Sequence, residues 1–394
     1  MSIRDQFDRE ALRAGLEACG ADGWLLYDFR GTNPVAGRVL GLGGMGSRRL
    51  FVYLPLAGEP VAVAHKIELG PMQGFPGTVL PYARWQELHE ALRSVVAGRT
   101  VAMEISPGDA VPYLDRVPLG VVELIRSLGG TVVPSGGLVT QFAARWNVEE
   151  TANHERAAEA LAAIARDALA WAVTRGGTGL TECELQSRVV DAIHAAGLEF
   201  DHPPIVGFGP NAADPHYEPI AGKDRTLGRD EVVLIDLWAG PGLGTVFADQ
   251  TWMGFSGPRP PERVQLVWET VRDARDAALA RVEDRVSRGA ELRGYEVDRA
   301  ARDVIEAAGF GQYFVHRTGH SIDRDLHGSG PHCDDYETRD DRLMMPGVGF
   351  SIEPGIYLPG EFGVRSEVNM YWGPTGAVVT PGARQRDLVV SGQA

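Results

Sequence analysis

Histidines gather in one short stretch of this sequence. Four of the ten histidines, His316, His320, His327 and His332, fall within 17 of the 394 residues, where an even spread would place fewer than one. Imidazole is the commonest metal ligand in proteins, and its proton exchanges near neutral pH. A lone histidine is usually structural, but a cluster of four points to metal binding or proton transfer.

Four carboxylates occupy positions from which an apolar strand normally excludes charge. Asp236 ends the run 232–235, Asp249 follows the run 246–248, and Glu353 and Glu367 lie within the strand-like segments 350–354 and 363–368. Burying an unpaired carboxylate costs several kcal/mol, so such groups are normally paired or bound to metal. Any one of them could cap a strand or pair with an arginine. The four carboxylates, gathered around one histidine, would carry more negative charge than Arg365 alone can offset. Two divalent cations would balance this negative charge.

Carboxylate oxygens with one imidazole suit manganese, cobalt, iron or zinc, and they exclude a thiolate-rich zinc site. Two ions about 3.5–4 Å apart can hold a bridging hydroxide at neutral pH and polarise a carbonyl group, which is hydrolytic chemistry. A single-ion site built from His320, Asp323, Asp325 and His327 is an alternative, but it would leave the four strand carboxylates unexplained.

Six sequence blocks around these residues occur in a characteristic order. They are FGPNAADPHY at 208–217, LIDL at 234–237, ADQT at 248–251, HRTGH at 316–320 with His327 beyond it, IEPGIY at 352–357 and GVRSE at 363–367. In these blocks the sequence resembles the pita-bread metallopeptidases, which include prolidase, aminopeptidase P, methionine aminopeptidase and creatinase. The resemblance is strong over about 150–390 and weaker in the preceding domain.

The resemblance implies a site in which five side chains bind two divalent metal ions: Asp236, Asp249, His320, Glu353 and Glu367. It implies that Asp249 and Glu367 bridge both ions and that Glu353 also handles the proton of the bridging water. His327 would contact the substrate carbonyl, and His216 would hydrogen-bond the substrate. Further positions that surround the ligands or bind substrate in the proline-specific branch are His316, Tyr357 and Arg365.

Several positions depart from the family pattern. The two aspartates are separated by 12 residues where the family usually has 10, which predicts a longer hairpin at 240–245. Thr251-Trp252-Met253 replaces the usual Thr-Arg-Thr, and Gly328 stands where a glutamate usually follows the second histidine. Every ligand is kept, so the departures concern the pocket around the site.

The elements that must position these residues divide into two groups. In the first third, helical patterns at 5–19, 85–96 and 118–128 alternate with apolar runs at 24–27, 50–54, 61–64, 101–103 and 131–133, which predicts an α/β domain with a largely parallel sheet. After a Gly/Ser stretch at 135–137, helices are predicted at 148–173, 182–196, 261–284 and 294–308, and strands at 205–207, 232–237, 245–253, 349–356, 362–371 and 377–380. With the resemblance, this predicts an α+β protein with an amino-terminal creatinase-like α/β domain at 1–140 and a catalytic pita-bread domain at 141–394.

Composition excludes several other classes of protein. The net charge of −15 disfavours nucleic-acid binding, and no apolar run approaches the roughly 18 residues of a membrane span. The charged amino end lacks the apolar core of a signal peptide, and three scattered cysteines fit a reducing compartment, so we expect a cytoplasmic protein. The motif G-x-G-x-x-G at 41–46 precedes a strand-like run rather than a helix, which argues for a loop instead of a dinucleotide site.

These observations predict a dinuclear enzyme that hydrolyses Xaa-Pro bonds in dipeptides or short peptides, as a prolidase or an Xaa-Pro aminopeptidase, by means of a metal-bridging hydroxide. Manganese is the first choice of ion, with cobalt or zinc as alternatives, and the family resemblance implies a homodimer. In the amino-terminal domain, Arg48, Arg49 or Asp28 is expected to limit substrate length. The alternatives are another hydrolase on this fold, such as a creatinase-like amidinohydrolase, or a non-catalytic binding protein; retention of all five ligands argues against both.

Overall fold

The computed structural model of the chain describes residues 8–41 and 46–392. The chain forms two compact units, one ending at Ala144 and the other beginning at Arg145. Each unit has its own sheets and its own hydrophobic core. The motif at 41–46 falls mostly outside the described residues, whereas Arg48 and Arg49 lie within them.

The first unit is built on a six-stranded sheet with the order β4-β3-β2-β1-β5-β6. Its strands are β1 (Gly23–Asp28), β2 (Leu50–Pro55), β3 (Val61–His65), β4 (Thr78–Tyr82), β5 (Thr100–Met103) and β6 (Thr131–Pro134). The pairs β3–β4, β1–β5 and β5–β6 are parallel, whereas β2 runs antiparallel to both of its neighbours. The sheet is therefore mixed, and β4 was not predicted because Pro81 and its exposed residues weaken the strand pattern.

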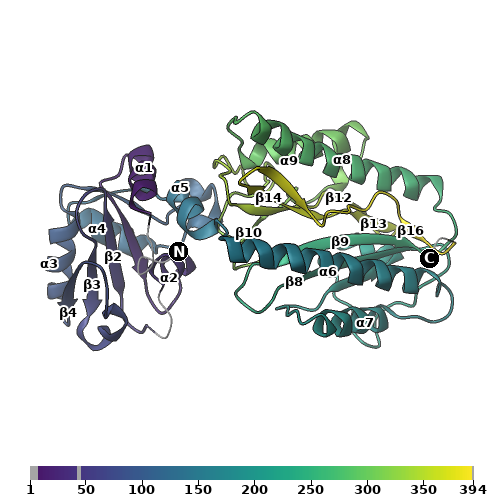
Figure 1. The fold of residues 1–394 in the computed structure, drawn as a ribbon, viewed down its shortest axis with the longest axis horizontal. Helices are drawn as coiled ribbons and strands as arrows, with labels where there is room; N and C mark the ends of the chain where they lie inside the picture. The colour runs from purple at the N-terminus through teal and green to yellow at the C-terminus, as the bar shows by residue number, and fades with distance from the viewer. Residues whose placement is uncertain (1–7, 42–45, 393–394) are drawn as a thin grey trace. The chain divides into compact units, whose positions relative to one another are not determined.

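Helices cover both faces of this sheet (Figure 1). They are α1 (Arg9–Cys19), α2 (Pro34–Leu40), α3 (Trp85–Val96), α4 (Leu119–Ser127) and α5 (Gly136–Val139). Side chains of a strand alternate between its two faces. Accordingly, Trp24 and Leu26 of β1 join one core with α1, α2 and α5, while Leu25 and Tyr27 join the other core with α3 and α4. Burial on both faces explains why β1 is a continuous apolar run.

The second unit sandwiches its strands between two pairs of long helices, α6 (Val148–Val173) with α7 (Glu182–Ala195) and α8 (Glu262–Ser287) with α9 (Gly294–Ala307) (Figure 1). One four-stranded sheet has the order β16-β9-β8-β7, formed by Val389–Val390, Ala248–Phe255, Val232–Ala239 and Ile205–Phe208. The other has the order β10-β11-β14-β15, formed by Ser321–Ile322, Gly349–Ile352, Val368–Gly373 and Gly376–Thr380. A separate hairpin pairs β12 (Gly355–Leu358) with β13 (Phe362–Arg365).

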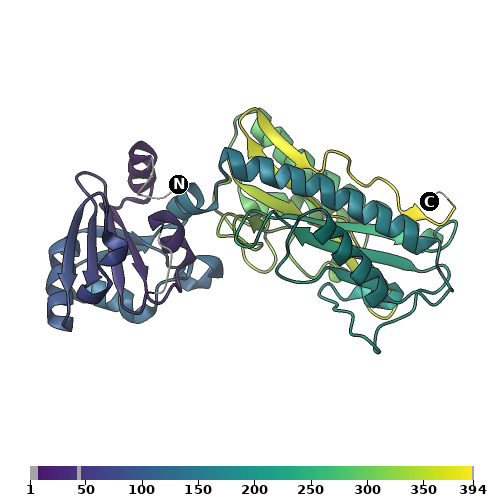
Figure 2. The ribbon, with the colours of Figure 1, turned by 60° about the horizontal axis from the view of Figure 1, so that its bottom comes forward.

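The two faces of β8 belong to different cores. Val233 and Ile235 pack with α6 and α7, and α6 lies against this sheet in both views (Figures 1 and 2). Val232 and Leu234 instead pack with α8 and α9. Among the helices that the structure describes, none combines the length and apolar character needed to cross a membrane.

Two predicted long strands are broken in the structure. The expected strand at 349–356 divides into β11 and β12, and the expected strand at 362–371 divides into β13 and β14. Glu353 lies at the first break and Glu367 at the second. Pro354 lacks an N–H for the strand ladder, which accounts for the first interruption. Glu353 and Glu367 therefore stand where strands stop, whereas Asp236 and Asp249 lie within β8 (Val232–Ala239) and β9 (Ala248–Phe255).

Candidate metal centre

Strand pairing brings the two aspartates together. In the antiparallel register of β8 and β9, Asp236 is opposite Thr251 and Trp238 is opposite Asp249. Because side chains alternate along a strand, Asp236, Asp249 and Thr251 project to the same side of the sheet, the side on which Leu234 and Met253 join the core with α8 and α9. The longer hairpin between the strands does not disturb this pairing.

Backbone and hydroxyl contacts orient His320. Its N–H donates to Ser351 Oγ at 2.9 Å, and its ring Nδ1 lies 3.2 Å from the carbonyl of Ser321. Since a carbonyl can only accept, Nδ1 is the donor, and Nε2 is left to face the carboxylates. It lies 3.3 Å from Asp249 Oδ2 and 3.4 Å from Glu353 Oε1.

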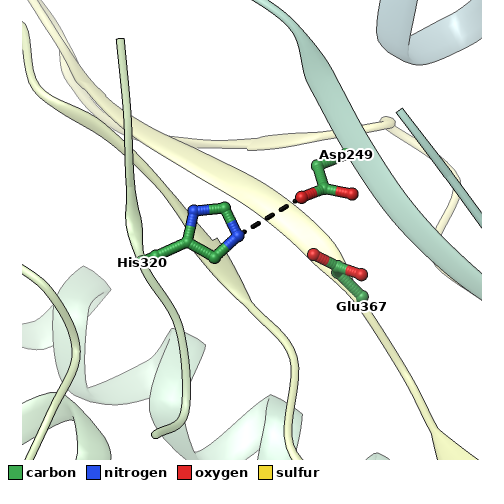
Figure 3. Close-up of side chains that lie close together, drawn as sticks. All are labelled: Asp249, His320 and Glu367. Atoms are coloured by element: carbon green, nitrogen blue, oxygen red, sulfur yellow. Dashed lines mark ion pairs between the residues drawn. The ribbon is translucent and has the colours of Figure 1, made fainter. Parts of the chain in front are cut away.

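Asp249, His320 and Glu367 form a compact buried cluster whose ligand atoms all lie within 4.8 Å of one another. Figure 3 shows the His320 ring directed at Asp249, with the Glu367 carboxylate beside them. Asp236 lies next to this cluster and contacts Arg365. Thr251 Oγ1 accepts from Arg365 Nε at 2.7 Å and lies 2.8 Å from Glu367 Oε2 and 3.2 Å from Asp236 Oδ1. The Thr251 hydroxyl has one proton and can donate it to only one of the two carboxylates, Glu367 or Asp236, at a time. The two acids therefore share a single hydroxyl donor.

The electrostatics of the site indicate missing positive charge. Burial, reinforced by the neighbouring carboxylates, raises the pKa of Glu367 well above its ordinary value and also raises that of Asp249. Burial raises the pKa of Asp236 to about 7 despite the nearby Arg365. In addition, Glu367 Oε1 is buried and has no hydrogen-bond partner among the described residues. Four oxygen-donor carboxylates, one imidazole and an unsatisfied oxygen fit divalent cations, so these residues could hold the predicted ions.

His320 and Glu353 behave differently from the other acids and bases in the cluster. Burial lowers the pKa of His320, but the hydrogen bond to Asp249 and the charge of Glu353 outweigh it and raise the pKa. Burial raises the pKa of Glu353, but the positive charges of His320, His316 and Arg365 outweigh it and lower the pKa. Glu353 is thus the carboxylate of the group that is held ionised.

A cavity of about 670 Å³ opens onto this cluster. It is lined by all five predicted ligands and by His216, His327 and Arg365. The His327 ring lies edge-on to His320, with centroids 4.3 Å apart. The charge of His320, together with burial, lowers the pKa of His327 to about 3, so His327 is neutral at pH 7.

Two predicted substrate-binding residues do not line this cavity. His316 is hydrogen-bonded through Nε2 to the Tyr357 hydroxyl at 2.8 Å and through Nδ1 to the Arg317 carbonyl at 2.7 Å. Tyr357 is buried, and the cavity lining among the described residues includes neither side chain. Substrate contact by His316 or Tyr357 therefore stays a prediction.

The alternative single-ion site is not assembled. Asp323 uses its two oxygens to accept from the N–H groups of Asp325 at 2.9 Å and Ser329 at 2.8 Å, which shapes the loop that carries His327. Among the described residues, the compact cluster of possible ligands contains His320 with Asp249 and Glu367, and neither Asp323 nor Asp325.

Glu182 is a residue near the site that the sequence analysis missed. Its fully buried carboxylate accepts from Phe208 N at 2.7 Å, Asn211 Nδ2 at 3.1 Å, the Tyr217 hydroxyl at 2.6 Å and Arg225 N at 2.8 Å. All four donors belong to the segment 208–225, which carries His216. The capping-box pattern at 181–184 predicted the start of the helix. It could not predict that the Glu182 carboxylate would bind a loop more than 20 residues away, because that contact depends on the tertiary structure.

Comparison with known proteins identifies similar chains across both units. A family profile described as metallopeptidase family M24 matches residues 152–372. A probable dipeptidase PepE of Mycobacterium tuberculosis is 32% identical over 327 residues, which cover 81% of this chain and 80% of that protein. An Xaa-Pro dipeptidase of Lactobacillus helveticus is 34% identical over 169 residues, 41% of this chain and 40% of that protein.

Among solved structures, dipeptidase PepE from Mycobacterium ulcerans superposes with a TM-score of 0.71 at 26% identity, covering 98% of this chain and 99% of that one. A prolidase from Thermococcus sibiricus superposes with a TM-score of 0.65 at 24% identity, covering 98% and 100%. These likenesses span the whole chain and confirm the predicted fold class, a pita-bread fold preceded by a creatinase-like α/β domain.

Proposed function

Because the chain belongs to metallopeptidase family M24, as its motifs predicted, we propose that it hydrolyses Xaa-Pro dipeptides with two divalent cations held by Asp236, Asp249, His320, Glu353 and Glu367. The observation that carries this proposal is the buried acid–histidine cluster with its unsatisfied Glu367 oxygen, opening onto a cavity of about 670 Å³. The names of two relatives, a probable dipeptidase and an Xaa-Pro dipeptidase, support the substrate class.

Divalent cations at this site would supply an activated water and a Lewis acid for the peptide carbonyl. The chain's own residues would do the rest. Glu353 lines the cavity, 3.0 Å from Ser351 Oγ, and as an ionised carboxylate it could take a proton from the attacking water and pass it to the departing nitrogen. His327, which is neutral at pH 7, could donate a hydrogen bond to the substrate oxygen as negative charge develops there, and so could His216.

The cavity is also large enough for a dipeptide. A volume of about 670 Å³ is in the range of small-molecule sites and would accommodate a dipeptide. We further propose manganese as the resident ion, with cobalt or zinc as alternatives, and a homodimer in the cytoplasm. Support for the ion comes from the oxygen-rich donor set, and support for the assembly comes from the family resemblance.

The decisive experiment combines elemental analysis with substrate comparison. The purified chain is stripped with chelator and reloaded with manganese, cobalt or zinc, and hydrolysis of Leu-Pro, Leu-Ala and Leu-Pro-Gly is measured. We expect two ions per chain, loss of activity on stripping, and faster turnover of Leu-Pro than of the other two. Preference for Leu-Ala would overturn proline specificity, and preference for Leu-Pro-Gly would make the enzyme an aminopeptidase. Creatine turnover that survives chelation would favour the amidinohydrolase alternative.

A further inference from the structure

A second cavity, of about 340 Å³, lies within the first unit. The side chains that define its chemistry are Tyr27, Phe29, Arg48, Arg49, Tyr82 and Trp85. Arg48 and Arg49 are two of the residues expected to limit substrate length. The third, Asp28, instead uses its carboxylate to accept from Gly31 N and Asn33 N, at 3.0 Å each.

Sheet topology explains why these residues meet. β1 and β3 are both antiparallel to β2 and hence parallel to each other, and β4 is parallel to β3. The carboxyl ends of β1, β3 and β4 therefore lie at one edge of the sheet, beside the start of β2. Tyr27 and Tyr82 stand at strand ends on this edge, and Arg48 and Arg49 lead into β2. Ligands of open α/β sheets commonly bind outside the carboxyl ends of the strands.

Two donors of this cavity, the Tyr27 hydroxyl and the Arg49 guanidinium, differ from Arg48, whose Nη1 donates to the Ser47 carbonyl at 3.1 Å. The Tyr27 side chain is only 4% exposed, yet its hydroxyl has no hydrogen-bond partner among the described residues. Within the same part of the chain, no hydrogen bond or ion pair engages the Arg49 guanidinium. The Tyr82 hydroxyl is already used, since it donates to the Arg49 carbonyl at 2.7 Å.

The nearest acids do not neutralise Arg49. Glu68 accepts from Ser47 N at 2.8 Å and Arg48 N at 3.1 Å, and Asp28 holds its own loop. Arg49 also lies near both phenols: burial raises the pKa of Tyr27 and of Tyr82, and the positive charge of Arg49 opposes the rise in each. A phenol donor and a guanidinium thus face one cavity whose lining, among the described residues, includes no carboxylate. The imidazole of His65, which also lines the cavity, uses Nδ1 to accept from Ile67 N at 3.3 Å.

The walls of the cavity are aromatic and open to solvent. Phe29 is 38% exposed and Trp85 is 60% exposed, and both line the cavity. The Trp85 ring is steadied edge-on by His89, with centroids 5.1 Å apart. Exposed rings beside an unpaired cation offer a surface for the apolar part of a ligand whose anionic end reaches the donors.

We propose that this cavity binds a small carboxylate carried on an apolar ring, with the carboxylate accepting from the Tyr27 hydroxyl and the Arg49 guanidinium and the ring lying against Phe29 and Trp85. The planar guanidinium matches a carboxylate with two parallel hydrogen bonds. Every residue that lines the site belongs to the first unit, and binding there is measured separately from peptide hydrolysis.

Benzoate is the probe for this site, and binding to the full-length chain is measured by calorimetry after chelator treatment, so that carboxylate binding to metal does not contribute. We expect one saturable site, with benzamide, the neutral analogue, and acetate, which lacks the ring, each at least tenfold weaker. Arg49→Gln is expected to weaken benzoate at least tenfold and Tyr27→Phe about threefold to tenfold. Arg126→Gln, at an exposed position on α4, is the matched control and keeps the parental affinity.

Circular dichroism and melting of each variant establish that the fold is intact before its affinity is compared. Equal binding of benzamide and benzoate would overturn the proposal, as would parental affinity in both Arg49→Gln and Tyr27→Phe. Tighter binding of phenyl phosphate than of benzoate would replace the carboxylate by a phosphate. Loss of peptidase activity has no bearing on these outcomes, because binding is scored without metal.

Discussion

The hydroxyl of Tyr217 donates to the carboxylate of Glu182 at 2.6 Å, and this bond ties the loop that carries His216 to the first residue of α7. Glu182 is fully buried and accepts from three further donors of the same segment. A buried carboxylate surrounded by four donors fixes the positions of those donors, because leaving any of them unpaired is costly.

Tyr217→Phe removes this hydrogen bond while keeping the ring. We expect kcat/KM for an Xaa-Pro dipeptide to fall about threefold to tenfold with metal content unchanged, because the His216 loop loses one of its attachments. Tyr371→Phe is the matched control: it removes another 2.6 Å tyrosine–glutamate bond, to Glu155, away from the cavity lining.

Combining Tyr217→Phe with His216→Ala tests whether Tyr217 affects kcat/KM through His216. If Tyr217 acts through His216, Tyr217→Phe lowers kcat/KM little further in the His216→Ala background. Additive losses in the double variant would show that Tyr217 acts elsewhere. A parental rate in His216→Ala itself would remove His216 from the proposed reaction.

Glu353→Gln should separate catalysis from binding. The amide keeps the shape of the side chain but cannot accept a proton, so kcat is expected to fall at least about 100-fold while KM changes less than about threefold. Glu361→Gln, an exposed glutamate paired with Arg263, is the control and should retain full turnover. A near-parental kcat in Glu353→Gln would exclude the proton-transfer role.

Asp249→Ala and Glu367→Ala should each abolish binding of both ions, because both acids are proposed to bridge them. Binding to the folded state alone raises its stability by mass action, so manganese should raise the Tm of the parental chain and of the control Asp303→Ala, but not that of the two variants. Asp303 is an exposed acid of α9 that pairs with Arg299. Two-ion occupancy by elemental analysis in either variant would refute bridging.

His154 should make the second unit acid-sensitive. Its ring is fully buried between the Phe247 carbonyl at 3.0 Å and Thr380 Oγ1 at 2.8 Å, and burial lowers its pKa to about 4. The unfolded chain, with a histidine pKa of about 6.5, binds this proton more readily, so stability falls by up to about 3 kcal/mol as the pH drops from 6.5 to 4.

Denaturant unfolding between pH 7 and pH 4.5 tests this sign. His154→Gln should be less stable at pH 7, where it loses packing against Trp146, but its stability should fall less on acidification. His194→Gln, at an exposed position on α7, should keep the parental slope. Equal slopes in His154→Gln and the parental chain would show that His154 does not titrate in this way.

Gly319→Ala should displace the segment that carries His320. A Cβ at Gly319 would lie 1.9 Å from the backbone carbonyl oxygen of Ser351, which cannot rotate away. Overpacking of this kind costs about 1–3 kcal/mol, and we expect a lower Tm together with reduced manganese content. Gly382→Ala, where the nearest atom would be 3.5 Å away, should leave both unchanged. An unchanged metal content in Gly319→Ala would show that the segment tolerates the shift.

Much of the secondary structure and of the candidate metal site could be predicted from the sequence, because it depends on local chemistry. The strand at 232–236 could be predicted from its apolar content, and the helix Val148–Val173 from its composition and its capping residues. Both predictions succeed because each signal lies within a single element. Four of the five proposed ligands stood out because carboxylates beside apolar runs need compensation, wherever the runs are placed, and His320 stood out as part of a histidine cluster.

Contacts across large sequence separations were decided by the tertiary structure alone. Strand pairing set Asp236 opposite Thr251, and strand breaks placed Glu353 and Glu367 at the cavity. His316 and Tyr357 instead form a hydrogen-bonded pair that is not part of the described lining. The four donors around Glu182, and the Tyr27 hydroxyl and Arg49 guanidinium that no described residue engages, follow equally from how loops and strand ends meet. A sequence records which groups need a partner, but the partner is chosen by the path of the backbone, and that path depends on all the packing in the unit at once.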